Sequence, residues 1–218
     1  MKIEILKKIS FEELEKMIRD IPMLGDKNIF PYKEAHITLS RFRYDEVNPP
    51  QFYIINKNLQ TQRELYEAIS FYGFDQLNLT NEVAALEIKN LDTNEIWTLT
   101  PPIIELASRT IRYLPNHEEI DHSNNPVKIN IQLICDGLHR VAYSKERDGF
   151  FNGIKIVGAN QNYPYYAHPN GWEMVKFVEE VPSSILEKKL YSRKDCYHLY
   201  RDFGSIGCGK PRVVVKNE

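Results

Sequence analysis

The most informative part of the sequence is Ile129-Asn-Ile-Gln-Leu-Ile-Cys135 followed by Asp136-Gly137-Leu138-His139-Arg140-Val-Ala-Tyr143. Its first part alternates apolar and polar residues and becomes apolar on both faces at its end, as in a strand that runs into a core. Gly137 permits a sharp turn, and the residues after it suit a helix. The sequence therefore predicts a strand over 127–135, central in its sheet, followed at once by a helix over 138–147.

The predicted turn places several chemically capable side chains at the start of a helix, where free N–H groups and the helix dipole bind anions. Arg140 can hold an anion with two parallel N–H bonds, and His139 can donate a hydrogen bond or move a proton near neutral pH. Asp136 can orient His139, bind Mg²⁺ or act as a base. The same spacing fits equally well a purely structural turn, in which Asp136 caps the helix and the other two pair with carboxylates.

The rest of the chain shows further helical and strand patterns. Ser10 with Glu13, and Thr61 with Glu64, have the spacing of capping boxes, which predicts that a helix starts at each. We expect helices over 11–21, 61–72 and 172–180, one or two helices within 183–203, and strands over 35–44, 52–55, 83–89, 95–100, 153–158 and 213–215. The strand–helix–strand order around Gly137 allows either a right-handed crossover unit or a small mixed sheet.

Composition sets the broad class of the protein. The chain has 218 residues, of which 42% are hydrophobic, and a net charge of −2. This length fits one large domain or a core with an added lobe. The charge offers no basic excess for nucleic acid, no apolar run reaches the roughly 18 residues of a membrane span, and no signal peptide is visible. We expect a cytoplasmic protein with reduced thiols at Cys135, Cys196 and Cys208.

Two other segments imitate functional motifs. The stretch 204–210 has the glycine and lysine spacing of a P-loop, but no strand precedes it and Pro211 replaces the serine or threonine. His117 and His122 lie among acidic residues in a polar loop without a ligand spacing typical of metal sites. We therefore expect neither a P-loop nor a metal site built from these residues.

The stretch Asp136-Gly-Leu-His-Arg-Val-Ala142 resembles the Asp-Gly-(His/Gln)-His-Arg motif of the ParB/sulfiredoxin-like superfamily. The likeness extends over roughly residues 95 to 180, and it includes the strand before the motif, the helix after it and the strand at 153–158. It implies a small α+β domain that binds nucleotide phosphates at this helix start. Members of the superfamily include CTP-binding partition proteins, sulfinic acid reductases and free-serine kinases.

The predicted fold is therefore α+β. We expect a small mixed sheet with a strand–turn–helix phosphate site over residues 95–181, as in the ParB/sulfiredoxin-like core. An N-terminal α+β extension would occupy residues 1–94, and a helical C-terminal tail would occupy residues 182–218.

Departures from the superfamily pattern narrow the expected activity. Sulfiredoxins carry a catalytic cysteine immediately before the His-Arg pair, where this chain has Leu138 and has Cys135 only in the preceding strand. Partition proteins continue into a helix-turn-helix DNA-binding region, whereas the tail here is short. The motif is closest to that of the kinase-like members, which use a carboxylate as base, and Glu105 is the candidate for that role.

The resemblance implies a nucleotide-binding protein, with ATP or another nucleoside triphosphate and Mg²⁺ as cofactors and a small-molecule acceptor. Gly137, Leu138, His139 and Arg140 would bind phosphate, and Glu105, Asp136 and His139 would serve catalysis. Two alternatives stay open: a non-catalytic nucleotide-binding regulatory module, and a DNA-associated nuclease or modification accessory. The composition argues against a membrane or nucleic-acid partner, while a homodimer or a protein partner could use the N-terminal extension.

Overall fold

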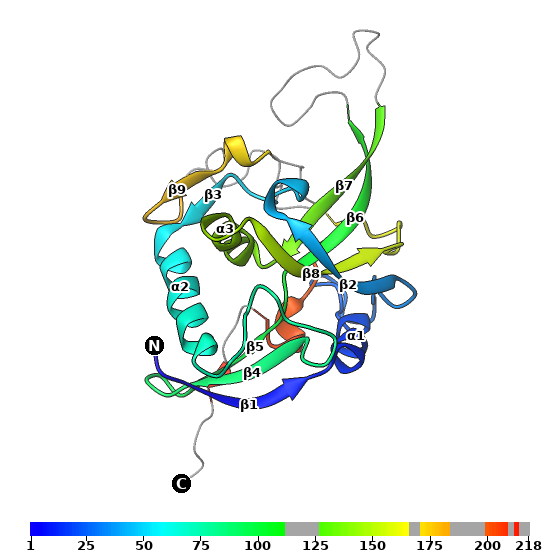
Figure 1. The fold of residues 1–218 in the computed structure, drawn as a ribbon. Helices are drawn as coiled ribbons and strands as arrows, with labels where there is room; N and C mark the ends of the chain where they lie inside the picture. The colour runs from blue at the N-terminus through cyan, green and yellow to red at the C-terminus, as the bar shows by residue number, and fades with distance from the viewer. Residues whose placement is uncertain (112–126, 166–170, 184–198, 209–211, 214–218) are drawn as a thin grey trace.

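The predicted strand–turn–helix is present in the computed structural model of the chain. The structure describes residues 1–111, 127–165, 171–183, 199–208 and 212–213 (Figure 1). The strands (β), α-helices (α) and 3-10 helices (η) follow one another along the chain in this order: β1 (Ile3–Ile9), α1 (Phe11–Arg19), β2 (His36–Arg43), η1 (Tyr44–Glu46), β3 (Tyr53–Ile55), α2 (Asn56–Ser70), β4 (Ala85–Asn90), β5 (Glu95–Leu99), β6 (Ile103–Ile111), β7 (Val127–Asp136), α3 (Leu138–Glu146), β8 (Phe150–Val157), η2 (Trp172–Met174), β9 (Lys176–Val178), η4 (Phe203–Ile206) and β10 (Arg212–Val213). The predicted α+β class is confirmed.

The motif belongs to a mixed sheet with the strand order β2-β8-β6-β7. Strand β6 pairs antiparallel with β7 and parallel with β8, so it separates the two strands that flank α3. The mixed-sheet alternative is therefore correct, and the crossover unit is not formed. The expectation that the motif strand is central was wrong: β7 lies at the edge of this sheet, and β6, which was not predicted as a strand, lies inside it.

Strand β6 was missed because Pro101 and Pro102 precede it. Proline cannot donate to a sheet ladder, but it is tolerated just before a strand begins. Here the strand starts at Ile103, immediately after the two prolines, and the Pro102 carbonyl still accepts a hydrogen bond of 2.8 Å from the Ile154 amide. The rigid dipeptide therefore leads the chain into the centre of the sheet.

A second sheet has the strand order β1-β4-β5-β10, and β3 pairs in parallel with β9. The predicted hairpin of β4 and β5 is confirmed by their antiparallel register. Its turn covers residues 91–94 and β5 begins at Glu95, so the hairpin spans the predicted boundary, and the mixed sheet likewise pairs β2 with β8 from beyond it. The division of the chain into separate regions at 94/95 stays a prediction. In both sheets, strands from before this point pair with strands from after it.

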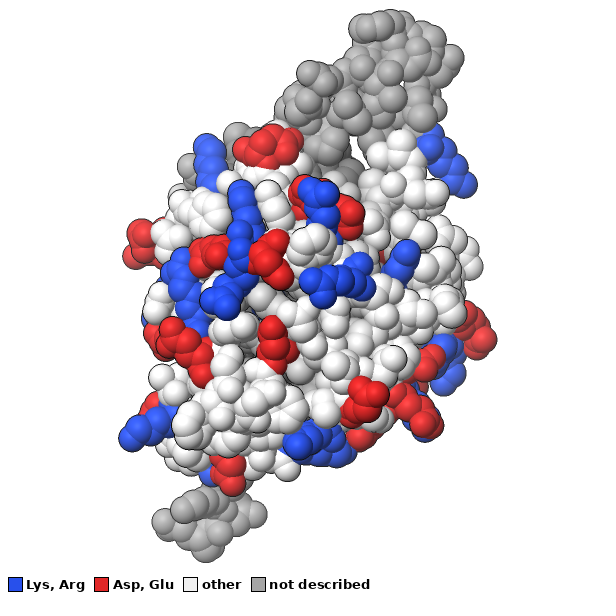
Figure 2. Space-filling model, viewed as in Figure 1, with Lys and Arg blue, Asp and Glu red and all other residues white. Residues whose placement is uncertain are grey.

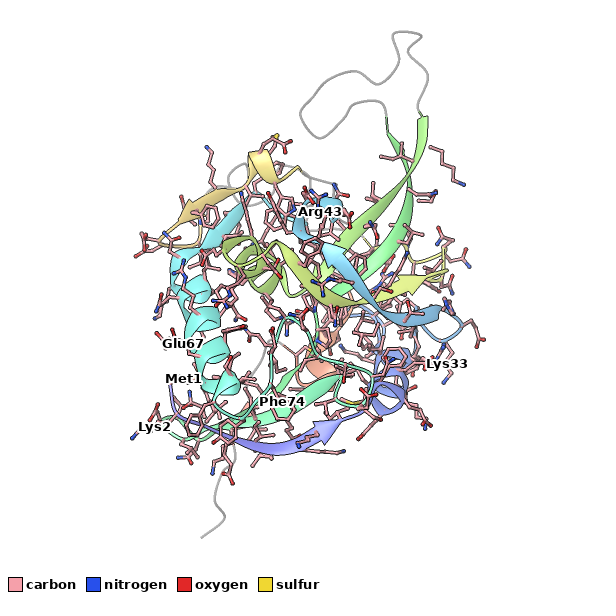
Figure 3. The ribbon with its side chains drawn as sticks, viewed as in Figure 1. Met1, Lys2, Lys33, Arg43, Glu67 and Phe74 are labelled. Carbon is pink, nitrogen blue, oxygen red and sulfur yellow. The ribbon has the colours of Figure 1, made fainter. Side chains whose placement is uncertain are left out.

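Three apolar clusters hold these layers together. One face of the mixed sheet packs against α1, through residues such as Leu14, Ile18 and Leu133. The opposite face packs against α3, where Ile104 and Ile134 meet Val141. The third cluster lies between α2 and the β1-β4-β5 sheet, and Figure 3 shows Phe74 and Glu67 in this part of the molecule. Because both faces of the mixed sheet are covered, the motif turn is held between packed layers.

Of the two predicted capping boxes, one starts a helix and the other does not. Ser10 caps α1 as expected, with its Oγ accepting from the Glu13 amide at 3.3 Å. Thr61 does not start a helix: α2 already begins at Asn56, and the Thr61 hydroxyl donates to the Lys57 carbonyl at 3.1 Å. A threonine inside a helix often bonds the preceding turn in this way, which imitates a cap in the sequence.

The C-terminal third also departs from the predicted helices. The segment predicted as a helix over 172–180 forms η2 and the short strand β9 instead, because its main chain pairs with β3. Most of the helical prediction for 183–203 lies outside the described residues, as do the loop with His117 and His122 and part of the stretch 204–210. Among the described residues, no helix is long and apolar enough to cross a membrane. On the face drawn in Figure 2, basic and acidic side chains are interspersed.

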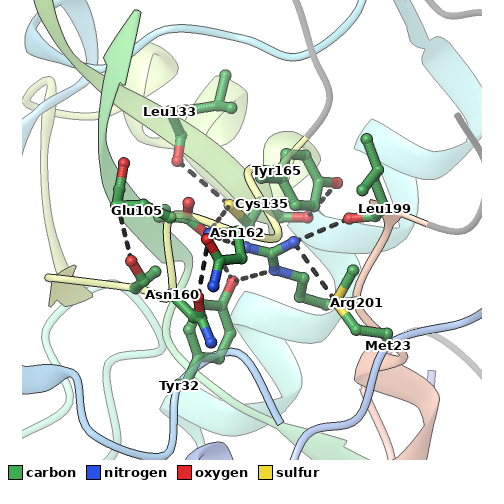
Figure 4. Close-up of polar contacts among 12 residues, drawn as sticks. Met23, Tyr32, Glu105, Leu133, Cys135, Asn160, Asn162, Tyr165, Leu199 and Arg201 are labelled. Carbon is green, nitrogen blue, oxygen red and sulfur yellow. Dashed lines mark hydrogen bonds and ion pairs between the residues drawn. The ribbon is translucent and has the colours of Figure 1, made fainter. Parts of the chain in front are cut away.

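A buried ion pair ties the described C-terminal segment to the mixed sheet. Arg201 Nη2 donates to Glu105 Oε2 at 3.1 Å, and their side chains are 0% and 3% exposed. Tyr32 donates to the same carboxylate oxygen at 3.0 Å (Figure 4). The Arg201 guanidinium also lies over the rings of Tyr32 and Tyr165, at 5.3 and 5.4 Å from their centroids. The segment is therefore fastened by a charged group that has no access to water.

Replacing Glu105 with glutamine is expected to lower the free energy of unfolding by about 3–5 kcal/mol, because Arg201 would keep its charge in a buried site without a counter-charge. The matched control is Glu146→Gln, which breaks the exposed pair with Arg63 and should change stability by no more than about 1 kcal/mol. Urea denaturation of the three proteins measures both effects. Equal losses in the two variants would contradict the role assigned to the buried pair.

Candidate functional site

The turn between β7 and α3 depends on a glycine for two reasons. Gly137 has φ +86°, a left-handed conformation that side chains rarely adopt, and it is the N-cap residue of α3. A Cβ at this position would also lie 2.9 Å from both Arg140 Nη2 and Pro102 Cα. Because these atoms occupy the space of a side chain, the turn requires glycine for its backbone conformation and for packing.

Arg140 holds this turn from within the first turn of α3. Its Nη2 donates to Asp136 Oδ2 at 2.7 Å, and its Nη1 donates to the Thr100 carbonyl just before the two prolines. Arg140 is 9% exposed, so both bonds form in a shielded environment. The structural alternative for the turn is therefore right about an Arg–carboxylate pair and wrong about the cap, since Gly137 and not Asp136 occupies the N-cap position.

His139 joins the motif to the start of α2. Its Nε2 accepts a hydrogen bond of 3.4 Å from the Ile55 amide, which leaves Nδ1 as the protonated nitrogen of the neutral ring. Burial lowers the pKa of His139, and the charge of Arg140 lowers it further, while Asp136 acts in the opposite direction. The imidazole is thus a neutral hydrogen-bond donor near pH 7.

The first amides of α3 complete the set of donors. Both Arg140 N and Val141 N bond to the Gly137 carbonyl, at 2.9 and 3.0 Å. The amides of Leu138 and His139 precede these bonds, so they lie at the positive end of the helix and can bind an anion. The Leu138 side chain contributes to the α3 core instead, with 8% exposure.

A cavity of about 420 Å³ opens in front of this turn, and residues 134–140 form one of its walls. The opposite walls come from α2 and from the β4–β5 hairpin, and include Gln62, Leu65 and Trp97. Its volume lies in the range of about 300–1,000 Å³ typical of small-molecule sites. The structure therefore brings together Asp136, Gly137, Leu138, His139 and Arg140 around one cavity.

Glu105 does not line this cavity. Successive residues of a strand point to opposite faces, and Ile104 packs toward α3. Glu105 accordingly points to the other face of the sheet, where it pairs with Arg201 and Tyr32. It has no described route to a ligand at the motif, so the structure separates this predicted base from the other predicted site residues.

The two described cysteines are free and buried, as expected for reduced thiols, while Cys196 lies outside the described residues. Burial raises the pKa of Cys135 well above its usual range, and the nearby Glu105 carboxylate adds to this shift. Burial also raises the pKa of Cys208, to about 12. These thiols stay protonated at neutral pH, and a protonated thiol is a poor nucleophile.

Several residues that shape the site were not predicted from the sequence. Thr100 acts through its carbonyl and Ile55 through its amide. Every residue type has these main-chain groups, so the amino-acid sequence does not indicate which of them contribute to a site. Trp97 had only a partial sequence signal, since it lies in the strand predicted over 95–100. Nothing local, however, placed that strand opposite the motif.

We expect Gly137→Ala to destabilise the fold more than Gly158→Ala. Both glycines have positive φ, +86° and +76°, but only Gly137 has atoms in the space of the added Cβ. The backbone strain of about 1–2 kcal/mol is shared by both variants, and overpacking should add about 1–3 kcal/mol at Gly137 alone. Urea denaturation provides the comparison. Equal destabilisation of the two variants would contradict the packing role of Gly137, because it would mean that Arg140 and Pro102 can move away from the added Cβ without lowering stability.

The lowered pKa of His139 predicts a pH-dependent part of the stability. The unfolded chain takes up the imidazole proton at about pH 6.5, above the pKa of the folded state. Stability is therefore fully present above about pH 6.5 and falls as the pH drops through the lowered folded-state pKa. Unfolding measured from pH 7.5 to 4.5 should show a smaller fall for His139→Gln than for the wild type. His36→Gln removes an exposed imidazole as the control and should follow the wild type.

A comparison with protein-family models found a match to the ParB CE domain over residues 13–176. No curated protein and no solved structure matched the chain. The matched region begins within α1, contains the motif and both walls of its cavity, and ends at the first residue of β9. Since this match covers most of the sequence, the chain belongs to the ParB CE domain family.

Proposed function

We propose that this protein binds a nucleoside triphosphate at the N-terminus of α3 and transfers a phosphoryl group to a small-molecule acceptor. The observation that carries the proposal is the cavity in front of the Asp136–Arg140 turn, into which a helix N-terminus and several polar side chains converge. A helix start with an adjacent glycine turn is suited to phosphate groups. The ParB-like family of the chain agrees with this use of the motif.

Phosphate recognition would rest on neutral donors supported by one cation. The amides of Leu138 and His139 and the Nδ1–H of His139 would donate to phosphate oxygens. Arg140 uses one N–H for Asp136 and another for Thr100, and a guanidinium has five N–H groups in all. Arg140 also lines the cavity, so its charge and remaining N–H groups would assist phosphate binding while its present bonds hold the turn in place.

Asp136 is the carboxylate of the site that would orient the acceptor. Its Oδ2 pairs with Arg140, and no described residue donates to its Oδ1. The part of the chain that the structure describes holds no cluster of three metal-ligating side chains. Mg²⁺ usually needs only one or two carboxylates in addition to phosphates and water, and Asp136 Oδ1 fits that requirement. When bound, the ion would neutralise phosphate charge.

Catalysis at such a site would come mainly from positioning and charge neutralisation, which is how phosphoryl transfer is generally accelerated. Asp136 Oδ1 can accept more than one contact, so beside Mg²⁺ it would also accept the hydrogen bond of the acceptor hydroxyl and hold it toward the phosphates. The hydroxyl proton would pass to this carboxylate as the phosphoryl group leaves the nucleoside diphosphate. His139, as a neutral donor, would bind the phosphates without adding a second positive charge beside Arg140. Glu105 has no part in this scheme because it is paired on the other face of the sheet.

The proposal predicts that nucleoside triphosphates with Mg²⁺ raise the melting temperature of the wild-type protein. A ligand at a hundred times its Kd stabilises the folded state by about 2.7 kcal/mol, which corresponds to a rise of roughly 5–10 °C at this chain length. Arg140→Ala should abolish the rise and any formation of nucleoside diphosphate in the presence of hydroxyl acceptors. The control is Arg41→Ala, which removes an exposed arginine outside the cavity and should retain both.

The melting experiment also separates the alternatives. An unchanged temperature rise in a folded Arg140→Ala protein would refute the assigned phosphate site. Nucleotide binding without phosphate transfer to any acceptor would favour the regulatory module over the transferase.

A further inference from the structure

The motif cavity has two ends with different chemistry. The end at α3 carries the charged and polar groups of Asp136, His139 and Arg140. The other end is built by the third apolar cluster, from α2 and the β4–β5 hairpin, and it consists mainly of Leu65, Ile88, Trp97 and Leu99. A ligand that fills the whole cavity must therefore combine an anionic group with an apolar one.

Trp97 differs from its apolar neighbours in what it leaves exposed. Leu65, Ile88 and Leu99 are 5%, 0% and 5% exposed, so they form the packed floor of this end. Trp97 pairs across the strands with Ile88 and is only partly buried, so its indole retains accessible surface where it lines the cavity. A flat aromatic surface of this kind is a stacking platform for planar rings.

The indole N–H gives a second, independent indication. The other tryptophan, Trp172, donates from Nε1 to the Val47 carbonyl at 2.9 Å. Among the described residues, none accepts a hydrogen bond from Trp97 Nε1. A tryptophan that is partly buried usually satisfies this donor. A molecule bound in the cavity that Trp97 lines is therefore a candidate partner for this donor.

We infer that Trp97 stacks on the base of the nucleotide whose phosphates bind at α3, so that α2 and the β4–β5 hairpin form the base subsite. This inference rests on the proposed nucleotide binding. It adds that the apolar end of the cavity binds the planar base of the nucleotide. The planar heterocycle would lie over the packed floor of Leu65 and Leu99. Gln62 and Thr98, which also line this end, are the polar side chains near its edge.

The test compares a nucleotide with its phosphate chain alone. Titration calorimetry of the full chain with Mg²⁺ would measure Kd for the four common ribonucleoside triphosphates and for inorganic tripolyphosphate. In Trp97→Leu, loss of one stacked base should weaken the best-bound nucleotide by about 5- to 150-fold. Tripolyphosphate binding should stay within about twofold of the wild type, because it engages only the α3 end.

Two further variants keep the test decisive. Trp97→Phe keeps an aromatic ring for stacking, so it should retain most of the nucleotide affinity of the wild type. This variant also keeps the test possible if Trp97→Leu fails to fold. Trp172→Phe alters the tryptophan outside the cavity and should leave both constants unchanged. In that variant Trp97 is the sole tryptophan, and its fluorescence should be quenched by nucleotide but not by tripolyphosphate.

The outcomes separate this inference from the proposed function. Equal affinity of the wild type for nucleotide and tripolyphosphate would overturn the base subsite and leave the phosphate site standing. Unchanged nucleotide affinity in Trp97→Leu, or an equal loss for both ligands, would also overturn it. A wild-type protein that binds neither ligand would overturn the phosphate site and the base subsite together.

Discussion

The contact on which the site depends is that of the Arg140 guanidinium with the Asp136–Gly137 turn. It bonds a carboxylate at the end of β7 and a carbonyl at the end of β5, and it fills the space over a residue without a side chain. One group thereby connects the edge strand of the mixed sheet with the chain segment that enters its centre. Since the guanidinium is nearly fully buried, these bonds meet little competition from water.

The two faces of the mixed sheet differ in how their polar groups are used. The α3 face ends at the motif and its cavity, so its polar groups remain available to a ligand. The α1 face encloses Glu105 with Arg201 and two tyrosines, so its polar groups contact one another and stabilise the fold. The alternation of side chains along β6 and β7 is the physical cause of this separation. The carboxylates of Glu105 on β6 and Asp136 on β7 consequently serve different ends: one stabilises the fold, and the other lines the cavity.

Much of the fold could be predicted from local pattern. The alternation in 129–135 and Gly137 predicted β7, the turn and α3, and the motif predicted the ParB-like family. The centrality of β6 could not be predicted in this way, because two prolines masked its start. The cavity walls could not be predicted either: Trp97 lines the same cavity as the motif because of sheet pairing and helix packing between segments far apart in sequence. For Glu105, chemical type suggested a base, and only the strand register shows that it points away.

The Arg201 side chain lies beyond the region that the family comparison matched, yet it completes a charge pair in the interior of the matched region. A fragment cut at the end of the match would leave the Glu105 carboxylate buried with a tyrosine hydroxyl as its main partner. Sequence profiles outline the part of a chain that relatives share, whereas the unit that folds also includes each segment that neutralises an interior charge. For this protein we therefore expect the smallest fragment that folds on its own to extend beyond the segment that identifies its family.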